Sequence, residues 1–283
     1  MTLVIESPGL LTLVQDLGRP GLGHLGVSPS GAFDRSALRQ VNLVLGNEPG
    51  AAALEVLRGE LVLRAETPTW VAVTGAAGPV TVDGDPRAYG RAIPLQAGQR
   101  LALGAPAAGL RSYVGVAGGF AVPEELGSRS TDTLAGLGPA PLKDGDRLAL
   151  GAATHPPDIE DVPTLGRTGE LTLDVMLGPR DDWFTTTAVR RLLESPWQVS
   201  PASDRVGVRL TGPALERARP DELPSEPCVR GSIQVSADGQ PIVFGPDHPV
   251  TGGYPVLAVV LNRHTDRLAQ AAPGQVVRFS RVS

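Results

Sequence analysis

The sequence predicts a mainly β protein made of two related domains with a few short helices, and three observations support this prediction. First, the 283 residues include 35 glycines and 27 prolines, more than a fifth of the chain, which favours short strands joined by turns. Second, residues 53–103 alternate short apolar runs with turn residues, a pattern that indicates a sandwich or barrel. Third, a turn glycine followed by alternating apolar residues recurs at residues 95–104, 142–151 and 271–280.

The recurring hairpin pattern occurs in both halves of the chain. Residues 152–166 are rich in proline and acidic side chains, which is typical of a linker between domains. We therefore expect an N-terminal β-barrel domain at residues 1–155 and a C-terminal β-barrel domain at residues 165–283. Two VSP elements, at residues 27–35 and 199–205, both end in Asp-Arg and favour the same two-part organisation.

Two short helices are expected among the strands. Apolar residues recur at helical spacing over residues 33–46, with Ser30 or Gly31 as the expected N-terminal cap. The amides at that helix start could attract an anion, although most such ends are simply capped. A second helix is expected at residues 185–194, and Pro196 would end it.

Composition excludes several classes of function. The net charge of −5 at pH 7 argues against nucleic acid or an anionic membrane as a partner. The single cysteine, Cys228, excludes an internal disulfide and a multi-cysteine metal site, and no metal ligand set is expected. The single lysine, Lys143, does not lie in a GxxxxGK[ST] phosphate loop. Because the sequence shows neither a signal peptide nor a long apolar run, we expect a cytoplasmic protein.

The densest group of candidate site residues lies at residues 231–255. Strands are expected at 232–235 and 241–244, joined by a tight turn at 237–240 that contains Asp-Gly. A loop at 245–253 follows the hairpin and is rich in proline, glycine and polar side chains. A polar loop bracketed by apolar strands is a plausible wall for a pocket.

That loop contains Asp247, His248 and Thr251, followed by Gly252 and Gly253. A carboxylate beside a histidine can hold one imidazole tautomer or favour the charged form, which suits acid–base chemistry or anion binding. The paired glycines would let backbone amides approach a ligand. The structural alternative is a surface histidine, and in either case we expect a loop histidine to contribute little to packing.

Two further loops carry polar side chains on a constrained backbone. Gln15, Asp16 and Arg19 lie next to glycines, which fits a ligand loop or, equally, a turn with an aspartate cap. Arg129 is flanked by hydroxyl side chains and followed by Asp132. An arginine in this setting suits a carboxylate or phosphate, whereas a structural Arg–Asp pair is the alternative.

Six motifs resemble the allophanate hydrolase subunit 2 family, in the order VQDLGRPG, HLGVSPSGAFDRSAL, GSRSTD, GPRDDWF, SPWQVSPASDRVGVRL and GQPIVFGPDHPVTGGYP. The resemblance extends from about Gly9 to Phe279. This family includes the C subunit of the prokaryotic ATP-dependent 5-oxoprolinase, an antagonist of a sporulation-kinase inhibitor, and half of the carboxyltransferase region of urea carboxylase. It implies two tandem cyclophilin-like β-barrel domains with a few short helices.

The resemblance also implies a function. The chain would be a hydrolase subunit, inactive alone, in a complex that converts 5-oxo-L-proline to L-glutamate with ATP used by the assembled complex. Its partners would be a subunit 1 (B-type) homologue, which shares the active site, and a lactam-hydrolase (A-type) subunit. The alternatives are a carboxyltransferase component acting on urea or another small amide, and a regulatory protein that binds a kinase inhibitor. Lys143 lies in KDGD and has no flanking methionines, so no biotin is expected on this chain.

Carried over to this sequence, the motifs imply a set of site residues. We expect His248 to transfer or orient a proton, with Asp247 and Asp34 as the other catalytic candidates. Arg19 or Arg129 would anchor a substrate carboxylate. Asp34 and Asp204 are also expected to fix backbone amides. The full set of expected substrate-binding residues is Gln15, Asp16, Arg19, Ser30, Arg129, Asp132, Asp204, Arg205, Gln234, Thr251 and Tyr254.

Overall fold

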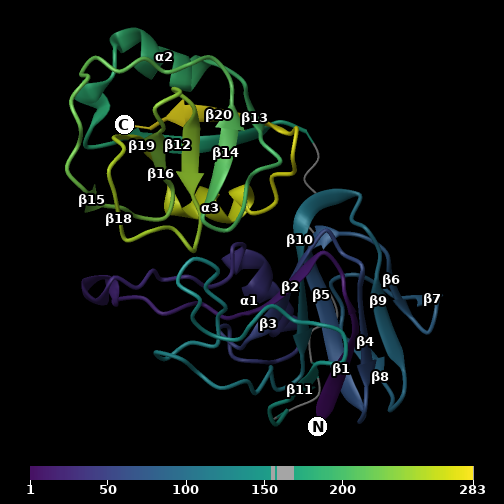
Figure 1. Ribbon diagram of the computed structural model, residues 1–283. Helices are drawn as coiled ribbons and strands as arrows, with labels where there is room; N and C mark the ends of the chain where they lie inside the picture. The colour runs from purple at the N-terminus through teal and green to yellow at the C-terminus, as the bar shows by residue number, and fades with distance from the viewer. Residues whose placement is uncertain (154–156, 158–168, 283) are drawn as a thin grey trace. The chain divides into compact units, whose positions relative to one another are not determined.

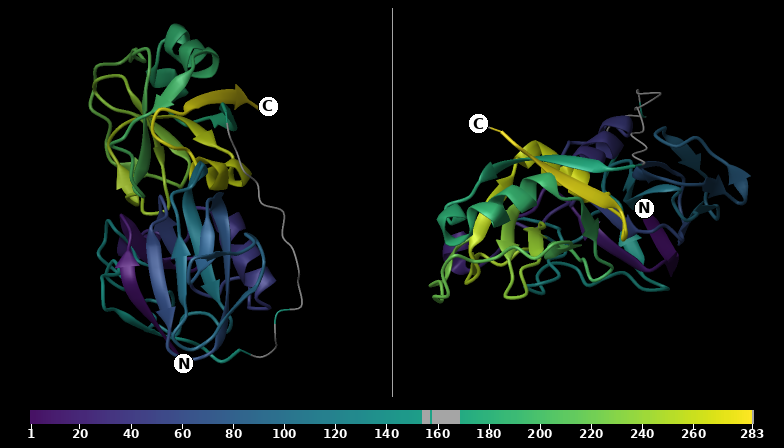
Figure 2. Two further views of the ribbon diagram at one scale, coloured as in Figure 1. Left: turned by 90° about the vertical axis from the view of Figure 1, so that its right-hand side faces the viewer. Right: turned by 90° about the horizontal axis from the view of Figure 1, so that it is seen from above.

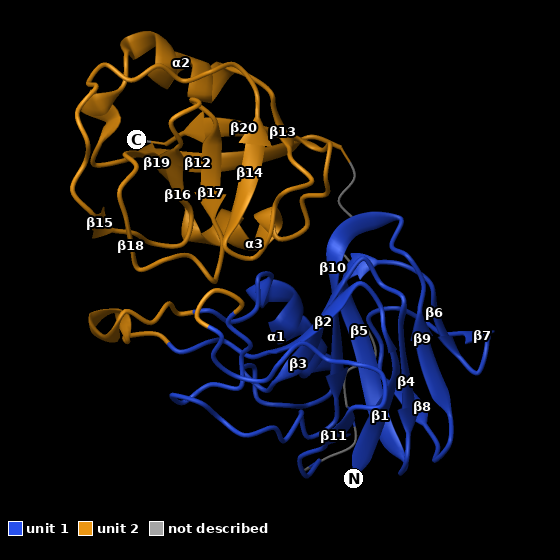
Figure 3. Ribbon diagram, in the orientation of Figure 1, with its two compact units in different colours: residues 1–19, 30–132, 136–168 blue, residues 20–29, 133–135, 169–283 orange. Residues whose placement is uncertain are grey.

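The computed structural model describes residues 1–153, 157 and 169–282. Contacts divide the chain into two compact units (Figure 3): unit 1 comprises Met1–Arg19, Ser30–Asp132 and Gly136–Thr168, and unit 2 comprises Pro20–Pro29, Thr133–Ala135 and Gly169–Ser283. Two short segments of the N-terminal half therefore belong to unit 2. The expected domain limits at 155 and 165 lie outside the described residues, and a duplication of one domain stays a prediction.

Unit 1 contains two antiparallel sheets, with one helix packed on the second of them (Figure 1). The six-stranded sheet has the order β11-β1-β4-β9-β6-β7 and the five-stranded sheet has the order β2-β3-β10-β5-β8. The strands of the first sheet are β1 Thr2–Pro8, β4 Leu61–Ala65, β6 Val80–Val82, β7 Asp85–Pro86, β9 Arg100–Leu103 and β11 Arg147–Ala149. Those of the second are β2 Leu11–Gln15, β3 Ala53–Leu57, β5 Thr69–Ala77, β8 Ile93–Leu95 and β10 Ala108–Val116.

The five-stranded sheet is buried on both faces. In β5, Val71 and Val73 belong to the core between the two sheets, whereas Ala72 packs with the helix. In β10, Val114 belongs to the core between the sheets and Tyr113 to the core beneath the helix. Successive side chains of a strand point to opposite faces, so this alternation produces three layers. It also explains why these strands are almost uniformly apolar.

Helix α1, Arg35–Val44, covers the outer face of the five-stranded sheet. It begins after Asp34, whose Oδ1 accepts a hydrogen bond from the Ala37 amide at 2.9 Å. The expectation that Ser30 or Gly31 caps the helix is wrong, because both have left-handed backbone conformations, with φ of 51° and 89°. Asp34 is a strong capping residue, and its carboxylate occupies the position at which an anion would meet the helix start.

Unit 2 is built around a closed barrel with the strand order β12-β19-β16-β17-β14-β13-β20. Its strands are β12 Leu171–Leu177, β13 Trp197–Val199, β14 Gly207–Thr211, β16 Ser232–Val235, β17 Pro241–Phe244, β19 Val256–Val260 and β20 Val276–Arg281. A separate two-stranded sheet pairs β15 Glu226–Pro227 with β18 Thr251–Gly252. Helices α2 and α3 lie at opposite ends of this barrel (Figures 1 and 2).

The sequence predicts one of the two helices of unit 2 but not the other. Helix α2, Thr186–Glu194, agrees with the expected helix to within one residue, and the Thr185 hydroxyl accepts a hydrogen bond from the Ala188 amide at 3.1 Å. Helix α3, Asn262–Leu268, was not predicted. Its sequence NRHTDRL has a single aliphatic side chain and therefore no helical apolar periodicity.

The recurring hairpin pattern corresponds to a recurring local structure. Gly98, Gly145 and Gly274 have nearly the same left-handed φ, at 87°, 86° and 83°. Each lies in a turn that leads directly into a strand, namely β9, β11 and β20. The predicted mainly β fold with a few short helices is confirmed, as are the predicted hairpin strands β16 and β17. No helix in the described part of the chain is long and apolar enough to cross a membrane.

Candidate functional site

A pocket of about 370 Å³ in unit 2 has His248 in its wall. Residues 248–251, from the loop after β17, form one side of it. Leu134 and Ala135 contribute from the segment 133–135, and Ser28 contributes with two glycines from the segment 20–29. Three stretches that are distant in the sequence therefore meet around one cavity within this unit.

His248 is buried, with only 3% of its surface exposed. Its ring stacks on Phe244, with centroids 5.8 Å apart and planes inclined by 9°. Nδ1 lies 2.9 Å from the Pro249 carbonyl oxygen. Because a carbonyl only accepts, Nδ1 carries the proton, and Nε2 is the acceptor atom of the neutral ring. The alternative of a surface histidine is therefore wrong, and so is the expectation that His248 contributes little to packing.

Asp247 is fully buried and pairs with Arg205, which is only 3% exposed. Arg205 donates from Nη2 to Oδ1 at 2.9 Å and from Nε to Oδ2 at 2.8 Å. The Thr133 amide and hydroxyl also donate to Oδ2, at 2.9 and 2.8 Å. Asp247 thus neutralises a buried guanidinium and holds a segment from the N-terminal half of the sequence. Thr133 was missed by sequence reasoning, because its residue type carries no signal and its partner lies 114 positions away.

Asp204 places Arg205 for this contact. Its Oδ1 accepts hydrogen bonds from the amides of Val206, at 2.9 Å, and Gly207, at 3.0 Å. The Asp247 amide in turn donates to the Arg205 carbonyl at 3.2 Å. The prediction that Asp204 fixes backbone amides is confirmed, and so is the same prediction for Asp34.

Gln234 and Tyr254 support the strand that carries Thr251. Gln234 Nε2 donates to the Tyr254 carbonyl at 2.9 Å and lies 3.6 Å from Cys228 Sγ. Burial raises the pKa of the Cys228 thiol, so it is a poor nucleophile at neutral pH. The Tyr254 side chain is 44% exposed, and the Arg217 guanidinium lies 5.5 Å from its ring centroid.

In unit 1, Asp16 joins the two polar loops of that unit. Its Oδ1 accepts from the Gly18 amide at 2.7 Å and from the Ser128 and Ser130 hydroxyls at 2.6 and 2.5 Å. Its Oδ2 accepts from the Arg129 amide at 2.6 Å. The contact with Gly18 is the aspartate-capped turn that was one of the two expected alternatives.

The two candidate anchor arginines have different surroundings. Arg19 is 2% exposed and donates to the backbone carbonyls of Glu125 and Ser130, and its Nη1 has no partner among the described residues. Arg129 forms an ion pair with Glu124 at 2.7 Å, and 37% of its side chain is exposed. The partner of Arg129 in this ion pair is a glutamate and not the aspartate of the expected Arg–Asp pair.

The remaining candidates of unit 1 lie around the backbone of Thr131. Gln15 Nε2 donates to the Thr131 carbonyl at 2.8 Å, and the Ser30 hydroxyl donates to the same oxygen at 3.3 Å. Asp132 is buried, and its amide donates to the Leu137 carbonyl at 2.9 Å. These contacts fix the course of the chain between Arg129 and residue 138.

The candidate residues therefore form two sets, one in each unit. The set in unit 2 is Asp204, Arg205, Gln234, Asp247, His248, Thr251 and Tyr254, and the set in unit 1 is Gln15, Asp16, Arg19, Ser30, Asp34, Arg129 and Asp132. Of all these candidates, His248 and Thr251 line the described pocket. Contact of any of them with substrate stays a prediction.

Residues 25–281 match the family described as "Carboxyltransferase domain, subdomain A and B". The chain belongs to this family. It is 40% identical over 285 residues to the C subunit of 5-oxoprolinase from Escherichia coli (strain K12), an alignment that covers 99% of this chain and 91% of that relative.

Other relatives of this carboxyltransferase-domain chain are much longer. The chain is 32% identical over 308 residues to urea amidolyase of Lachancea kluyveri, and the alignment covers 99% of the chain but 17% of that relative. The solved structure of the K. lactis urea amidolyase superposes with a TM-score of 0.92 at 31% identity and covers 100% of this chain and 19% of that one. The chain therefore corresponds to about a fifth of these longer proteins.

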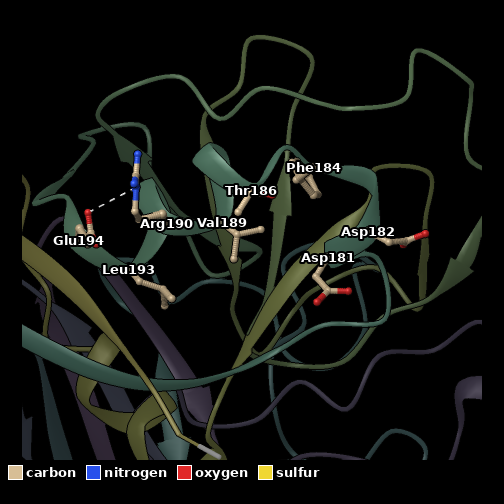
Figure 4. A pocket seen from close by; sticks show the side chains of 8 residues that line it. All are labelled: Asp181, Asp182, Phe184, Thr186, Val189, Arg190, Leu193 and Glu194. Atoms are coloured by element: carbon tan, nitrogen blue, oxygen red, sulfur yellow. Dashed lines mark ion pairs between the residues drawn. The ribbon is translucent and has the colours of Figure 1, made fainter.

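A second cavity of the carboxyltransferase-domain chain lies beside α2 and has a volume of about 480 Å³ (Figure 4). Phe184, Val189 and Leu193 contribute apolar side chains to it. Arg190 and Glu194 form a long ion pair at 3.9 Å along the helix. Its residues include part of the GPRDDWF motif, but none of the predicted site residues.

Proposed function

We propose that this chain is the C-type member of a multi-subunit 5-oxoprolinase, which converts 5-oxo-L-proline to L-glutamate in an ATP-dependent reaction. The observation that carries this proposal is the 40% identity to the C subunit of 5-oxoprolinase, which extends over 99% of this chain and 91% of that protein.

The chemistry explains why such a reaction uses several chains. A lactam is an amide and resists attack by water at neutral pH, so ATP must first activate it. The described part of this chain contains no group of three or more side chains arranged to bind a metal ion. We assign to this chain the binding and proton-transfer part of the reaction, and ATP use to the assembled complex.

His248 is the residue to which we assign proton transfer. Its ring is held by the Pro249 carbonyl and the Phe244 stack, so that Nε2 can accept a proton. The adjoining cavity of about 370 Å³ lies within the usual range for small-molecule sites. Thr251 lines the same cavity and can orient a polar group of the substrate.

The proposed partners are a subunit 1 (B-type) homologue and a lactam-hydrolase (A-type) subunit. With neither partner present, the chain is expected to be catalytically inactive. No biotin is attached to this chain in the proposed reaction. A stable complex should bury roughly 1,200–2,000 Å², as specific protein interfaces do.

A carboxyltransferase acting on urea or a related amide is the second candidate. The TM-score of 0.92 with the urea amidolyase structure favours it. The chain, however, covers only 19% of that protein, whereas it covers 91% of the 5-oxoprolinase relative from Escherichia coli. The higher identity, 40% against 32%, favours the 5-oxoprolinase assignment.

The test is reconstitution from purified subunits. The chain is assayed alone, with the B-type partner, and with both proposed partners, and glutamate release is measured with 5-oxoproline and ATP. Turnover only in the three-component mixture supports the proposal. Glutamate release by the isolated chain would contradict the shared-site assignment, and turnover that requires urea, bicarbonate and a biotinylated carrier would establish the carboxyltransferase instead.

A further inference from the structure

Thr133, Arg205 and Asp247 form a contact that we call the Asp247 clamp, in which Arg205 and Asp247 are buried and Thr133 is exposed. One carboxylate accepts two hydrogen bonds from Arg205, at 2.8 and 2.9 Å, and two from Thr133, at 2.9 and 2.8 Å. Asp247 has no exposed surface and Arg205 has 3%. The clamp therefore joins three parts of unit 2 that are distant in the sequence.

The position of the clamp relative to the pocket follows from the chain itself. Thr133 is followed directly by Leu134 and Ala135, which line one part of the cavity. Asp247 is followed directly by His248, which lines another part. A single carboxylate thus fixes the chain on two sides of the same cavity.

The segment 133–135 needs such an anchor. It contributes only three residues to unit 2, and the chain on either side of it belongs to unit 1. A buried ion pair adds little net stability compared with apolar packing, but it fixes geometry when all of its hydrogen bonds are made. The hydroxyl of Thr133 contributes one of two hydrogen bonds by which this residue reaches Asp247.

We propose that Thr133 is a positioning residue for substrate, which acts through Asp247 to hold the Leu134–Ala135 wall of the His248 pocket. The expected change in KM for 5-oxoproline rests on the proposed function, whereas the structural role of Thr133 does not. The Thr133 side chain does not touch the substrate in this account. Its hydroxyl sets the distance across the cavity, and so it governs how tightly a small amide fits.

The experiment compares Thr133→Val, Thr133→Ser and wild type in the reconstituted three-component complex. Valine keeps the shape and the backbone amide contact but removes the hydroxyl. A hydrogen bond to a charged group corresponds to roughly a tenfold change in an equilibrium constant, so KM for 5-oxoproline should rise about tenfold in Thr133→Val while kcat stays nearly constant. Thr133→Ser restores the hydroxyl and should recover most of the wild-type KM.

A matched control and a second readout keep the inference independent of the proposed reaction. Thr265→Val removes a hydroxyl elsewhere in unit 2, which is buried, donates to the Asn262 carbonyl at 2.8 Å in α3 and does not line the pocket. Hydrogen exchange of the Leu134 and Ala135 amides in the full chain should accelerate about tenfold in Thr133→Val but not in Thr265→Val.

The outcomes are distinct. A selective rise in KM with serine rescue, together with faster exchange at residues 134 and 135, supports the positioning role. Unchanged exchange at these amides overturns it, whatever reaction the complex catalyses. An unchanged KM in Thr133→Val, in a complex that does turn over 5-oxoproline, also overturns it. Absence of 5-oxoproline turnover in the wild-type complex contradicts the proposed function alone. Hydrogen exchange at residues 134 and 135 then tests the positioning role of Thr133 by itself.

Discussion

Two buried aspartates organise polar clusters in the two units, and their partners differ. In unit 1, Asp16 accepts four hydrogen bonds, all from hydroxyls and backbone amides. In unit 2, Asp247 accepts two hydrogen bonds from the guanidinium of Arg205 and two from Thr133. Both side chains are at least nine-tenths buried, with 8% and 0% exposed surface.

The difference shows that the partner of a buried carboxylate decides what its loss would do. Removing Asp16 leaves only neutral donors without this acceptor, namely two hydroxyls and two backbone amides. Removing Asp247 takes from a buried cation a carboxylate that accepts two of its hydrogen bonds, which is far more costly. Asp16 therefore shapes a loop, whereas Asp247 is required for the folded state around His248.

The largest stability effect is expected for Asp247→Asn. The free energy of unfolding of unit 2 should fall by about 3–5 kcal/mol, because the buried Arg205 loses a carboxylate that accepts two of its hydrogen bonds. Urea unfolding followed by the fluorescence of Trp183 and Trp197, which belong to this unit, measures the loss. Substitution of the exposed Asp221 by asparagine is the control. A loss below about 1 kcal/mol would show that the buried pair does not behave as described.

A smaller effect is expected for Asp16→Asn in unit 1. Loss of hydrogen bonds from neutral donors should lower the free energy of unfolding by about 1–3 kcal/mol. Urea unfolding followed by Trp70, which lies in β5 of this unit, is the measurement, with the exposed Asp144→Asn as the matched control. If Asp16→Asn is as damaging as Asp247→Asn, the distinction between the two networks fails.

Loss of a helix cap should lower the free energy of unfolding by less than either of these aspartate substitutions. Asp34→Ala removes the cap of α1 and Thr185→Ala removes the cap of α2, since each side chain accepts a hydrogen bond from the first helical turn. Each change should cost about 1 kcal/mol. Circular dichroism during thermal unfolding measures both variants, and substitution by serine should retain most of the stability. If Asp34→Ala leaves the stability unchanged, Asp34 does not act as a stabilising cap of α1.

Local signals in the sequence predicted the elements that local chemistry determines. The strands of the 231–255 hairpin were predicted with the bounds that the structure shows, because Asp238-Gly239 specifies the turn and apolar residues flank it. Helix α2 was predicted because Thr185 and Pro196 mark its two ends. Helix α3 was not predicted, since its position depends on packing against the barrel and not on its own pattern.

The sequence predicts most residues of the candidate site but not the hydrogen bonds that link them across the chain. The sequence predicts that Asp247 acts on its neighbour His248. The structure instead links Asp247 to Arg205, 42 positions earlier, and to Thr133, 114 positions earlier. Contacts over such separations have no periodic signature in one sequence. The assignment of short segments of the N-terminal half to unit 2 was invisible for the same reason.

The smallest effects concern two half-buried glutamates, one in each unit, that form ion pairs with arginines. Hydrogen bonds from Arg100 and Arg64 lower the pKa of Glu6, and a hydrogen bond from Arg180 lowers the pKa of Glu226. A carboxylate with a lowered pKa in the folded state stabilises it above the unfolded pKa, and this contribution is lost as pH falls through the folded pKa.

Glu6→Gln and Glu226→Gln should therefore be slightly less stable than wild type at pH 7, and the difference should vanish at acidic pH below the folded pKa. Urea unfolding at a series of pH values measures this difference in stability, and added salt should reduce the difference because the ion pairs are partly exposed to solvent. If the glutamine variants are still less stable than wild type by the same amount at the lowest pH, the glutamates do not stabilise the protein through their charge.

The most direct test of the central claim is the rate of the reconstituted complex with His248 replaced. His248→Phe keeps a ring to stack on Phe244 but has no Nε2, and His264→Gln alters a histidine that does not line the pocket. We predict that kcat/KM for 5-oxoproline falls by roughly 10²–10⁴-fold in His248→Phe, with complex assembly unchanged, and stays near wild type in His264→Gln. Wild-type kcat/KM in a folded, assembled His248→Phe complex would contradict the assignment of this pocket as the site of proton transfer.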